Sequence, residues 1–135
     1  MEHVLKSLFL FFLLSLSAGA ADCVDMDKDF LDYYGAPKES PLIGLSASVS
    51  GDKKDKIICL AESCGSGGCE CALYSPVENC MTRVLEFRGS HKVLGEKKDG
   101  MSAILVRKKG DPIAPALKKT FIWNKDRRRY VEDAK

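Results

Sequence analysis

The sequence predicts a small, mainly β domain: an antiparallel sandwich or barrel with one short N-terminal helix, stapled by disulfides. Three observations support this fold class. Short runs of β-branched, aromatic and aliphatic residues recur every roughly 8 to 15 residues, and turn-forming residues separate them. No helical pattern intervenes after the first forty residues, which favours antiparallel over parallel pairing. The chain also carries six cysteines.

The first segment has the pattern of a secretory signal peptide. Residues 5–16 are mostly apolar and are followed by the small residues Ala18 and Ala20, so we predict a signal peptide over residues 1–20, with Ala21 as the new N-terminus and cleavage one residue later as the alternative. The apolar run is shorter than the roughly 20 residues that span a bilayer, and no cysteine stands where a lipid would be attached. We therefore expect a periplasmic or secreted protein with no stable membrane anchor.

An N-terminal arm over residues 21–41 precedes a β domain over residues 42–135. Apolar and aromatic residues recur in the arm at helical spacing from Met26 to Tyr34, Asp22 or Asp25 can cap the first turn, and Gly35 can end the helix. The same aspartates also suggest a calcium loop. That alternative fails because the sixth position is Phe30, where such loops require glycine.

The strands of the β domain follow from their apolar and β-branched composition. We predict strands over residues 42–49, 56–61, 70–74, 82–87, 102–107, 120–123 and 129–132, with 91–95 as a further candidate. Residues 120–132 should form a terminal hairpin with Phe121 and Trp123 on one face. Its turn is placed at residues 124–126, so that residues 127–129, all arginine, make the second arm strongly basic.

The cysteines point to three disulfides, because paired thiols persist in an oxidising compartment. A bond between Cys64 and Cys69 is the first expectation, since the four residues between them are glycines and one serine that turn tightly. Cys71 is expected to pair with Cys59 or Cys80, which leaves Cys23 to fix the N-terminal arm. The spacing fits neither a zinc site nor a redox motif, so we predict no metal and no cofactor.

Charge is distributed unevenly along the chain. The formal net charge is only +2, yet residues 21–55 are acidic and residues 56–135 are basic. A nucleic-acid site would use the basic side chains together with two aromatic ones: Lys108, Lys109, Lys118, Lys119, Arg127, Arg128, Arg129, Trp123 and Tyr130. Export and the small net charge argue against that partner, and a solvated sheet face is the plainer explanation.

Catalytic chemistry has little support in the sequence. His91 is the only histidine after the signal peptide, and it has no nucleophile or acid in a recognised arrangement. Carboxylates such as Glu62 and Glu70 have no spacing that separates them from surface charge. We therefore name no catalytic residue and expect a protein that is not an enzyme, with a small periplasmic hydrolase as an alternative.

Three stretches of the chain carry a resemblance. The turn "CGSGGC", the segment "DGMSAILV" and the closing "FIWNKDRRRYVED" resemble small exported bacterial proteins that share a Cys-Gly-Ser/Thr-Gly-Gly-Cys turn and a C-terminal Trp-to-Tyr hairpin. The similarity covers residues 57–133 and implies a periplasmic β domain. It implies no catalytic residue, and Cys71, Cys80 and the acidic arm depart from the pattern.

The sequence thus predicts an exported binding domain that acts on another protein of the cell envelope, as an inhibitor or immunity-type protein that occludes its partner. A rigid disulfide-held loop and a basic hairpin would form the contact surface. Its candidate residues are aromatic, arginine or loop residues: Ser66, Tyr74, Arg88, Trp123, Arg128 and Tyr130. Core packing is the alternative for Tyr74 and Trp123. Binding of an anionic envelope polymer through the basic face is the alternative function.

Overall fold

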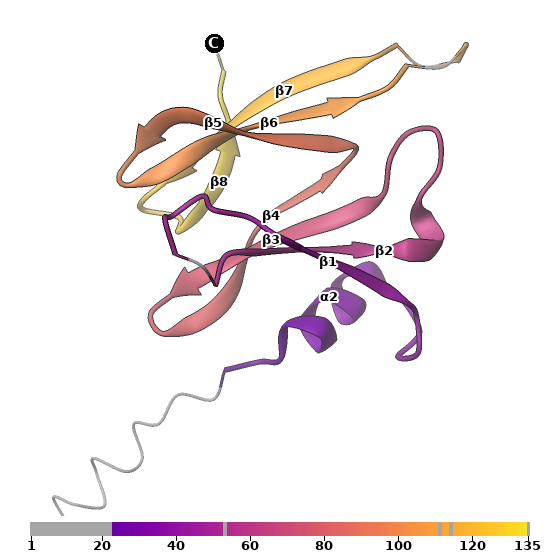
Figure 1. The fold of residues 1–135 in the computed structure, drawn as a ribbon, viewed down its shortest axis with the longest axis horizontal. Coiled ribbons are helices and arrows are strands. Elements are labelled where there is room, and N and C mark those ends of the chain that lie inside the picture. The colour runs from indigo at the N-terminus through magenta and orange to yellow at the C-terminus, as the bar shows by residue number, and fades with distance from the viewer. Residues whose placement is uncertain (1–22, 53, 111, 114, 135) are drawn as a thin grey trace, which may run out of the picture.

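A computed structural model describes residues 23–52, 54–110, 112–113 and 115–134. The predicted signal peptide lies outside these residues. The described chain forms two four-stranded antiparallel sheets that pack face to face, with one helix on the outer side of the first sheet (Figure 1). The predicted fold class is confirmed, and of its two forms the structure is the sandwich.

The N-terminal helix α2, Met26–Tyr34, begins and ends as the sequence predicts. Asp25 is the N-cap, and its side chain accepts a hydrogen bond of 3.1 Å from the backbone N–H of Lys28. Gly35 adopts a left-handed conformation at the C-terminus, with φ of 63°. The acidic run therefore serves as a helix start.

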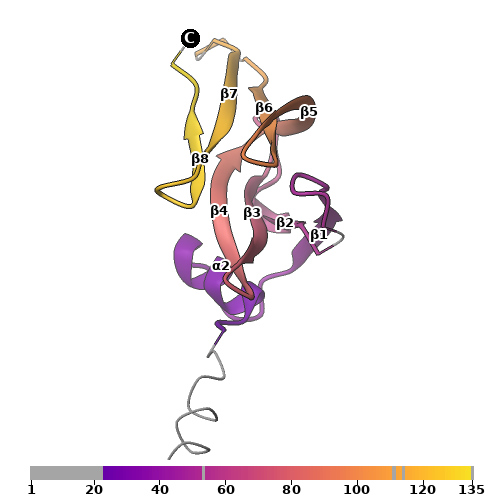
Figure 2. The same ribbon diagram turned by 90° about the vertical axis from the view of Figure 1, so that its left-hand side faces the viewer.

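The first sheet has the strand order β1-β2-β3-β4, and each pair is antiparallel. The strands are β1 Leu42–Ser46, β2 Lys56–Leu60, β3 Glu70–Val77 and β4 Cys80–Arg88. Its outer face carries Ile58, Ala72 and Tyr74, and Phe30 of α2 packs against them. Figure 2 shows α2 below this sheet, on the side away from the second sheet.

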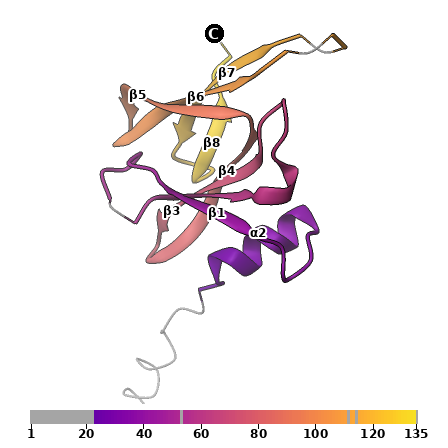
Figure 3. The same ribbon diagram turned by 45° about the vertical axis from the view of Figure 1, so that its right-hand side comes forward.

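The second sheet has the order β5-β6-β7-β8 and is also antiparallel throughout. Its strands are β5 Ser90–Lys98, β6 Met101–Lys108, β7 Leu117–Asn124 and β8 Arg129–Glu132. The ends of β6 and β7 near Lys108 and Leu117 extend past the rest of the sandwich as a two-stranded arm (Figure 3).

The core lies between the two sheets, because alternate residues of each strand face inward. The first sheet contributes Ile57, Leu73 and Leu85, and the second contributes Ile104 and Trp123. Phe121 packs against the same cluster, which confirms that Phe121 and Trp123 share a face.

The predicted first strand ends earlier than expected. Strand β1 stops at Ser46, although Ala47 and Val49 are both buried. The chain leaves the sheet there because its backbone finds other partners: Ala47 N donates to Asp55 O, and Val49 O accepts from Ser102 N of the second sheet at 2.8 Å. Buried residues therefore continue beyond the end of β1, so the run of apolar residues in the sequence is longer than the hydrogen-bonded strand.

Two turns differ from the sequence-based expectation. Glu78 and Asn79 form an unpredicted tight turn between β3 and β4, and both have positive φ. The last hairpin turns at residues 125–128, so Arg127 and Arg128 belong to the turn, where the sequence pattern placed them in the second arm of the hairpin; the predicted strand over residues 129–132 is confirmed. Arg128 has φ of 54°, and Arg127 N donates to Asn124 Oδ1 at 2.9 Å. Only Arg129 lies on β8.

All six cysteines are paired. The bonds are Cys64–Cys69, Cys59–Cys71 and Cys23–Cys80. The first confirms the expected loop bridge, the second selects Cys59 as the partner of Cys71, and the third fixes the arm to β4. Three disulfides indicate an oxidising, extracellular-type environment.

Candidate functional site

Basic side chains gather at the two ends of β7. Near Asn124 lies a group that we call the paired cluster, made of Arg83, Arg128 and Arg129 with the acids Asp29, Glu78 and Glu86. Near Leu117 lies a group that we call the basic end, made of Arg88, Arg107, Lys108, Lys109 and Lys118. The two groups differ in what surrounds their charges.

Arg83 is the most enclosed arginine of the paired cluster. Its Nη1 donates to Asp29 Oδ2 at 2.5 Å, and its guanidinium lies 4.2 Å from the centroid of the Tyr33 ring. Its buried Nε has no hydrogen bond and is 3.8 Å from Glu86 Oε2. Asp29 also accepts from the Tyr74 hydroxyl at 2.7 Å, and burial, followed by this bond, raises the pKa of Tyr74.

Arg129 and Arg128 join the two sheets. Arg129 Nη2 donates to both carboxylate oxygens of Glu86 on β4, each at 2.9 Å, and Arg128 pairs with Glu78 in the β3–β4 turn. A hollow of about 490 Å³ lies beside these pairs and includes Arg127. Because most of its cations are neutralised by acids, the paired cluster acts as a clasp between the sheets.

At the basic end the charges have few acids near them. Arg88 pairs with Glu70 at 3.0 Å. Arg107, Lys108, Lys109 and Lys118 form no ion pair within the described part of the chain. Arg107 and Lys118 stand directly opposite each other in the β6–β7 register, where two like charges destabilise an antiparallel pair.

Close backbone contacts build the basic end. Gly68 of the disulfide loop has φ of 92°, and a Cβ there would lie 2.4 Å from Gly89 Cα. Gly89 has φ of 117°, and a Cβ there would lie 2.2 Å from the carbonyl oxygen of Arg107. Only glycine allows this stack of loop, turn and strand. A Cβ on Gly67 would in turn lie 3.3 Å from Lys108 Cε, so the loop also borders the lysine side chain.

The stack leaves a hollow of about 380 Å³ on the β5–β6–β7 side. Its lining is strongly basic: Ser90, Arg107, Lys108, Lys109, Ala116, Leu117 and Lys118. Ser90 stands opposite Arg107 in the β5–β6 register. A concave surface with several cations and a hydroxyl is suited to bind an anion such as a phosphate.

The six predicted contact residues lie in three separate places. Ser66 is exposed in the disulfide loop and Arg88 lies at the basic end, close enough that a Cβ on Gly67 would be 3.7 Å from Arg88 Nε. Arg128 belongs to the paired cluster, at the other end of β7. On the surface the structure therefore brings Ser66 and Arg88 together, while in the core it brings Trp123 and Tyr130 together.

The three aromatic candidates are core residues. Tyr74 is 0 % exposed beneath α2, Tyr130 is 2 % exposed and Trp123 is 9 % exposed. Trp123 and Tyr130 are cross-strand neighbours with ring centroids 5.4 Å apart, and the Tyr130 hydroxyl donates to Ser102 O at 2.7 Å. These rings pack in the core and stabilise the sandwich, so the core alternative holds for Tyr74 and Trp123.

Sequence reasoning missed Arg107 as a site residue, although it noted the neighbouring lysines. The available signal was alternation: Val106 faces the core, so Arg107 must face outward, beside the outward residue of the next strand. The sequence does not state which strand pairs with β6, so it does not show that Lys118 lies opposite Arg107.

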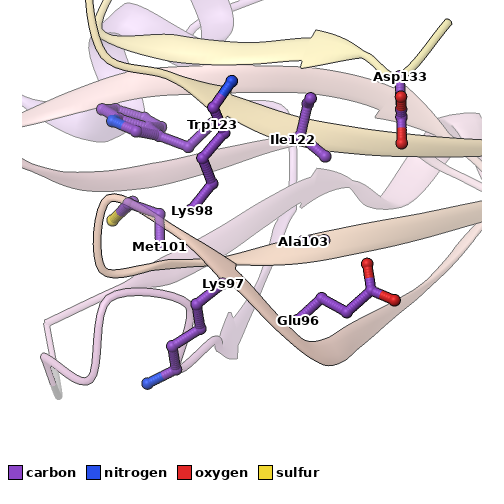
Figure 4. Close-up of a pocket in the computed structure, with 8 residues that line it drawn as sticks. All are labelled: Glu96, Lys97, Lys98, Met101, Ala103, Ile122, Trp123 and Asp133. Atoms are coloured by element: carbon purple, nitrogen blue, oxygen red, sulfur yellow. The ribbon is translucent and has the colours of Figure 1, made fainter.

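A third hollow, of about 380 Å³, lies on the second sheet (Figure 4). Apolar groups of Met101, Ala103, Ile122 and Trp123 line it, and the charged residues of its lining are Glu96, Lys97, Lys98 and Asp133. Acids and bases are mixed at its rim. It therefore gives no clear charge preference for a ligand.

His91, the histidine considered for catalysis, lies on β5 next to Phe87, with ring centroids 5.7 Å apart. Burial lowers its pKa. In the described residues no group of three or more His, Cys, Asp or Glu side chains is placed to hold a metal ion. Within the same residues, no helix has the length and apolar character needed to cross a bilayer.

The chain matches no family model, no curated protein and no solved structure. The resemblance to small exported bacterial proteins stays a prediction. Function must therefore be argued from the site.

Proposed function

We propose that this protein is an exported, non-enzymatic binding domain, periplasmic or secreted, that holds an anionic partner at its basic end. One observation carries the proposal: Arg107 and Lys118 face each other across β6 and β7, and no acid among the residues that the structure describes is paired with either. The same fold neutralises its arginines at the opposite end of β7. An arrangement that weakens the sheet locally is explained if a bound anion offsets the repulsion.

The rigid surroundings support the proposal. The disulfide Cys64–Cys69 and two backbone hydrogen bonds between Gly65 and Gly68, of 3.3 and 3.0 Å, fix the loop beside Lys108. A surface that is ordered before binding loses less conformational entropy on association. Such a site needs no catalytic group to retain an anion.

The test is binding of a soluble, fluorescein-labelled polyphosphate, followed by fluorescence anisotropy at low and high salt. We expect the affinity of the native protein to fall steeply with salt, and the double variant Arg107→Thr/Lys118→Thr to bind at least about tenfold more weakly. The control Lys125→Ser/Arg127→Ser removes two exposed charges at the other end of β7 and should stay within about twofold. Equal losses in the two double variants would refute a localised site.

A protein partner is the second candidate, as an inhibitor that occludes a hydrolase. It is favoured by the exposed Ser66 at the tip of the disulfide-closed loop, beside Arg88. Titration into an assay of a lysozyme-type hydrolase tests it, with Ser66→Arg as the variant that should abolish inhibition. Inhibition unchanged by that substitution would exclude the loop as the contact.

A further inference from the structure

The tip of the β6–β7 arm is apolar although its base is basic. Between Lys109 and Lys118 the sequence reads "GDPIAPAL", with one charged residue, and Ile113 and Leu117 are 96 % and 46 % exposed. Ile113 is the most exposed large apolar side chain of the described residues. Figures 1 and 3 show that this arm reaches beyond the rest of the molecule.

Apolar and basic groups therefore follow each other along the arm. Ile113 lies at the tip. Leu117 starts β7 and stands opposite Lys108 in the register, and Arg107 and Lys118 form the next cross-strand pair. A soluble polyanion would contact the basic residues alone and would leave the apolar tip exposed to water. A membrane surface with acidic lipids fits both parts, because apolar side chains enter the interface while Lys and Arg meet the lipid phosphates.

We propose that the β6–β7 arm docks this protein reversibly on a membrane surface that carries anionic phospholipids. Ile113 enters the interface, and the hollow lined by Arg107, Lys109 and Lys118 receives a headgroup phosphate. This inference rests on the proposed function and names its partner.

The base of the arm is suited to this task because it is fixed. The turn at Gly89 packs against the backbone of Arg107, and the disulfide loop packs on that turn. Pro112 directly precedes Ile113, and its ring restricts the backbone at that position. Docking therefore needs little ordering of the chain.

The test is sedimentation of the whole mature protein with lipid vesicles. One set contains neutral phosphatidylcholine alone, and the other contains about 30 mol% phosphatidylglycerol. We expect binding only to the anionic vesicles. Ile113→Ser should weaken vesicle binding about tenfold and leave polyphosphate binding unchanged, since only the membrane contact buries the isoleucine. Arg107→Thr/Lys118→Thr should weaken both. Val24→Ser, at another exposed apolar position, serves as the control and should change neither.

The outcomes separate the two proposals. Binding of polyphosphate without binding of anionic vesicles overturns membrane docking and leaves the anionic site standing. Vesicle binding that Ile113→Ser does not change overturns insertion of the tip. If the native protein binds neither polyphosphate nor anionic vesicles, the proposed function is overturned as well.

Discussion

The two basic groups at the ends of β7 use the same residue types for different purposes. In the paired cluster each of three arginines has a carboxylate partner, and the pairs join α2, β4 and the last hairpin. At the basic end, four of five cations have no carboxylate partner in the described part of the chain, and two of them repel each other across adjacent strands. Charge count alone would rank these regions alike, so the positions of the acids distinguish a structural clasp from a candidate binding site.

Breaking the paired cluster should produce the largest change. Glu86 is partly buried and lies beside both Arg129 and Arg83, so Glu86→Ala removes the carboxylate that pairs with Arg129 and the acid nearest to the Arg83 Nε, while Arg83 keeps Asp29. We expect a loss of about 2 kcal/mol in the free energy of unfolding, between the values for exposed and buried pairs. Urea denaturation measures it. Polyphosphate affinity should not change, and an unchanged stability would contradict the clasp.

Removing the acid of the basic end should change binding more than stability. Glu70→Gln takes away the partner of Arg88 in an exposed pair, so stability should fall by no more than about 1 kcal/mol. Polyphosphate binding should become about threefold tighter, because one negative charge beside the site is gone. Weaker binding would show that Glu70 positions Arg88 for the ligand. Anisotropy and urea denaturation on the same sample separate the two effects.

Relieving the repulsion between Arg107 and Lys118 should stabilise the free protein slightly. We expect Arg107→Thr to raise the free energy of unfolding by about 0.3 kcal/mol, since the like-charge pair disappears and threonine suits a strand. Arg107→Lys keeps the charge and should give no gain. Denaturation at low salt is the sensitive measurement. A clear loss of stability in the threonine variant would mean that Arg107 has a structural role.

The smallest effect should come from His91. Burial lowers its pKa in the folded state below the value near 6.5 of the unfolded chain, so the unfolded state takes up more protons as the pH falls through 6.5. Stability should therefore decrease below that pH and level off once the folded histidine is also protonated. His91→Gln should flatten this part of the curve. Thermal unfolding between about pH 5 and pH 8 tests it.

Local patterns were sufficient to predict most of the fold. The helix of residues 26–34 has its caps in the sequence, and the loop between Cys64 and Cys69 contains the glycines that its bridge requires. The end of β1 was not predictable, because burial of Val49 depends on a hydrogen bond from the second sheet. The pairing of Cys71 with Cys59 likewise follows from the β2–β3 register, which a sequence does not state.

The candidate site was harder to predict for the same reason. Tyr74 faces outward from the sandwich, and only the helix packed over it makes it a core residue. Arg128 was expected in the second arm of the last hairpin, yet it belongs to a four-residue turn and pairs with Glu78. Ser66 and Arg88 were named, but their neighbour Arg107 becomes notable only when the opposite residue is known.

The three disulfides also form a nested series. Cys64–Cys69 lies inside the span of Cys59–Cys71, which lies inside that of Cys23–Cys80, so no two bonds cross along the chain. Each inner bond shortens the flexible path that the next one must close, and closing a shorter loop costs less entropy. The chain can thus oxidise from the inside outward without threading any segment through a closed loop. The helical arm, attached by the outermost bond over a separation of 57 residues, becomes the last part to be secured.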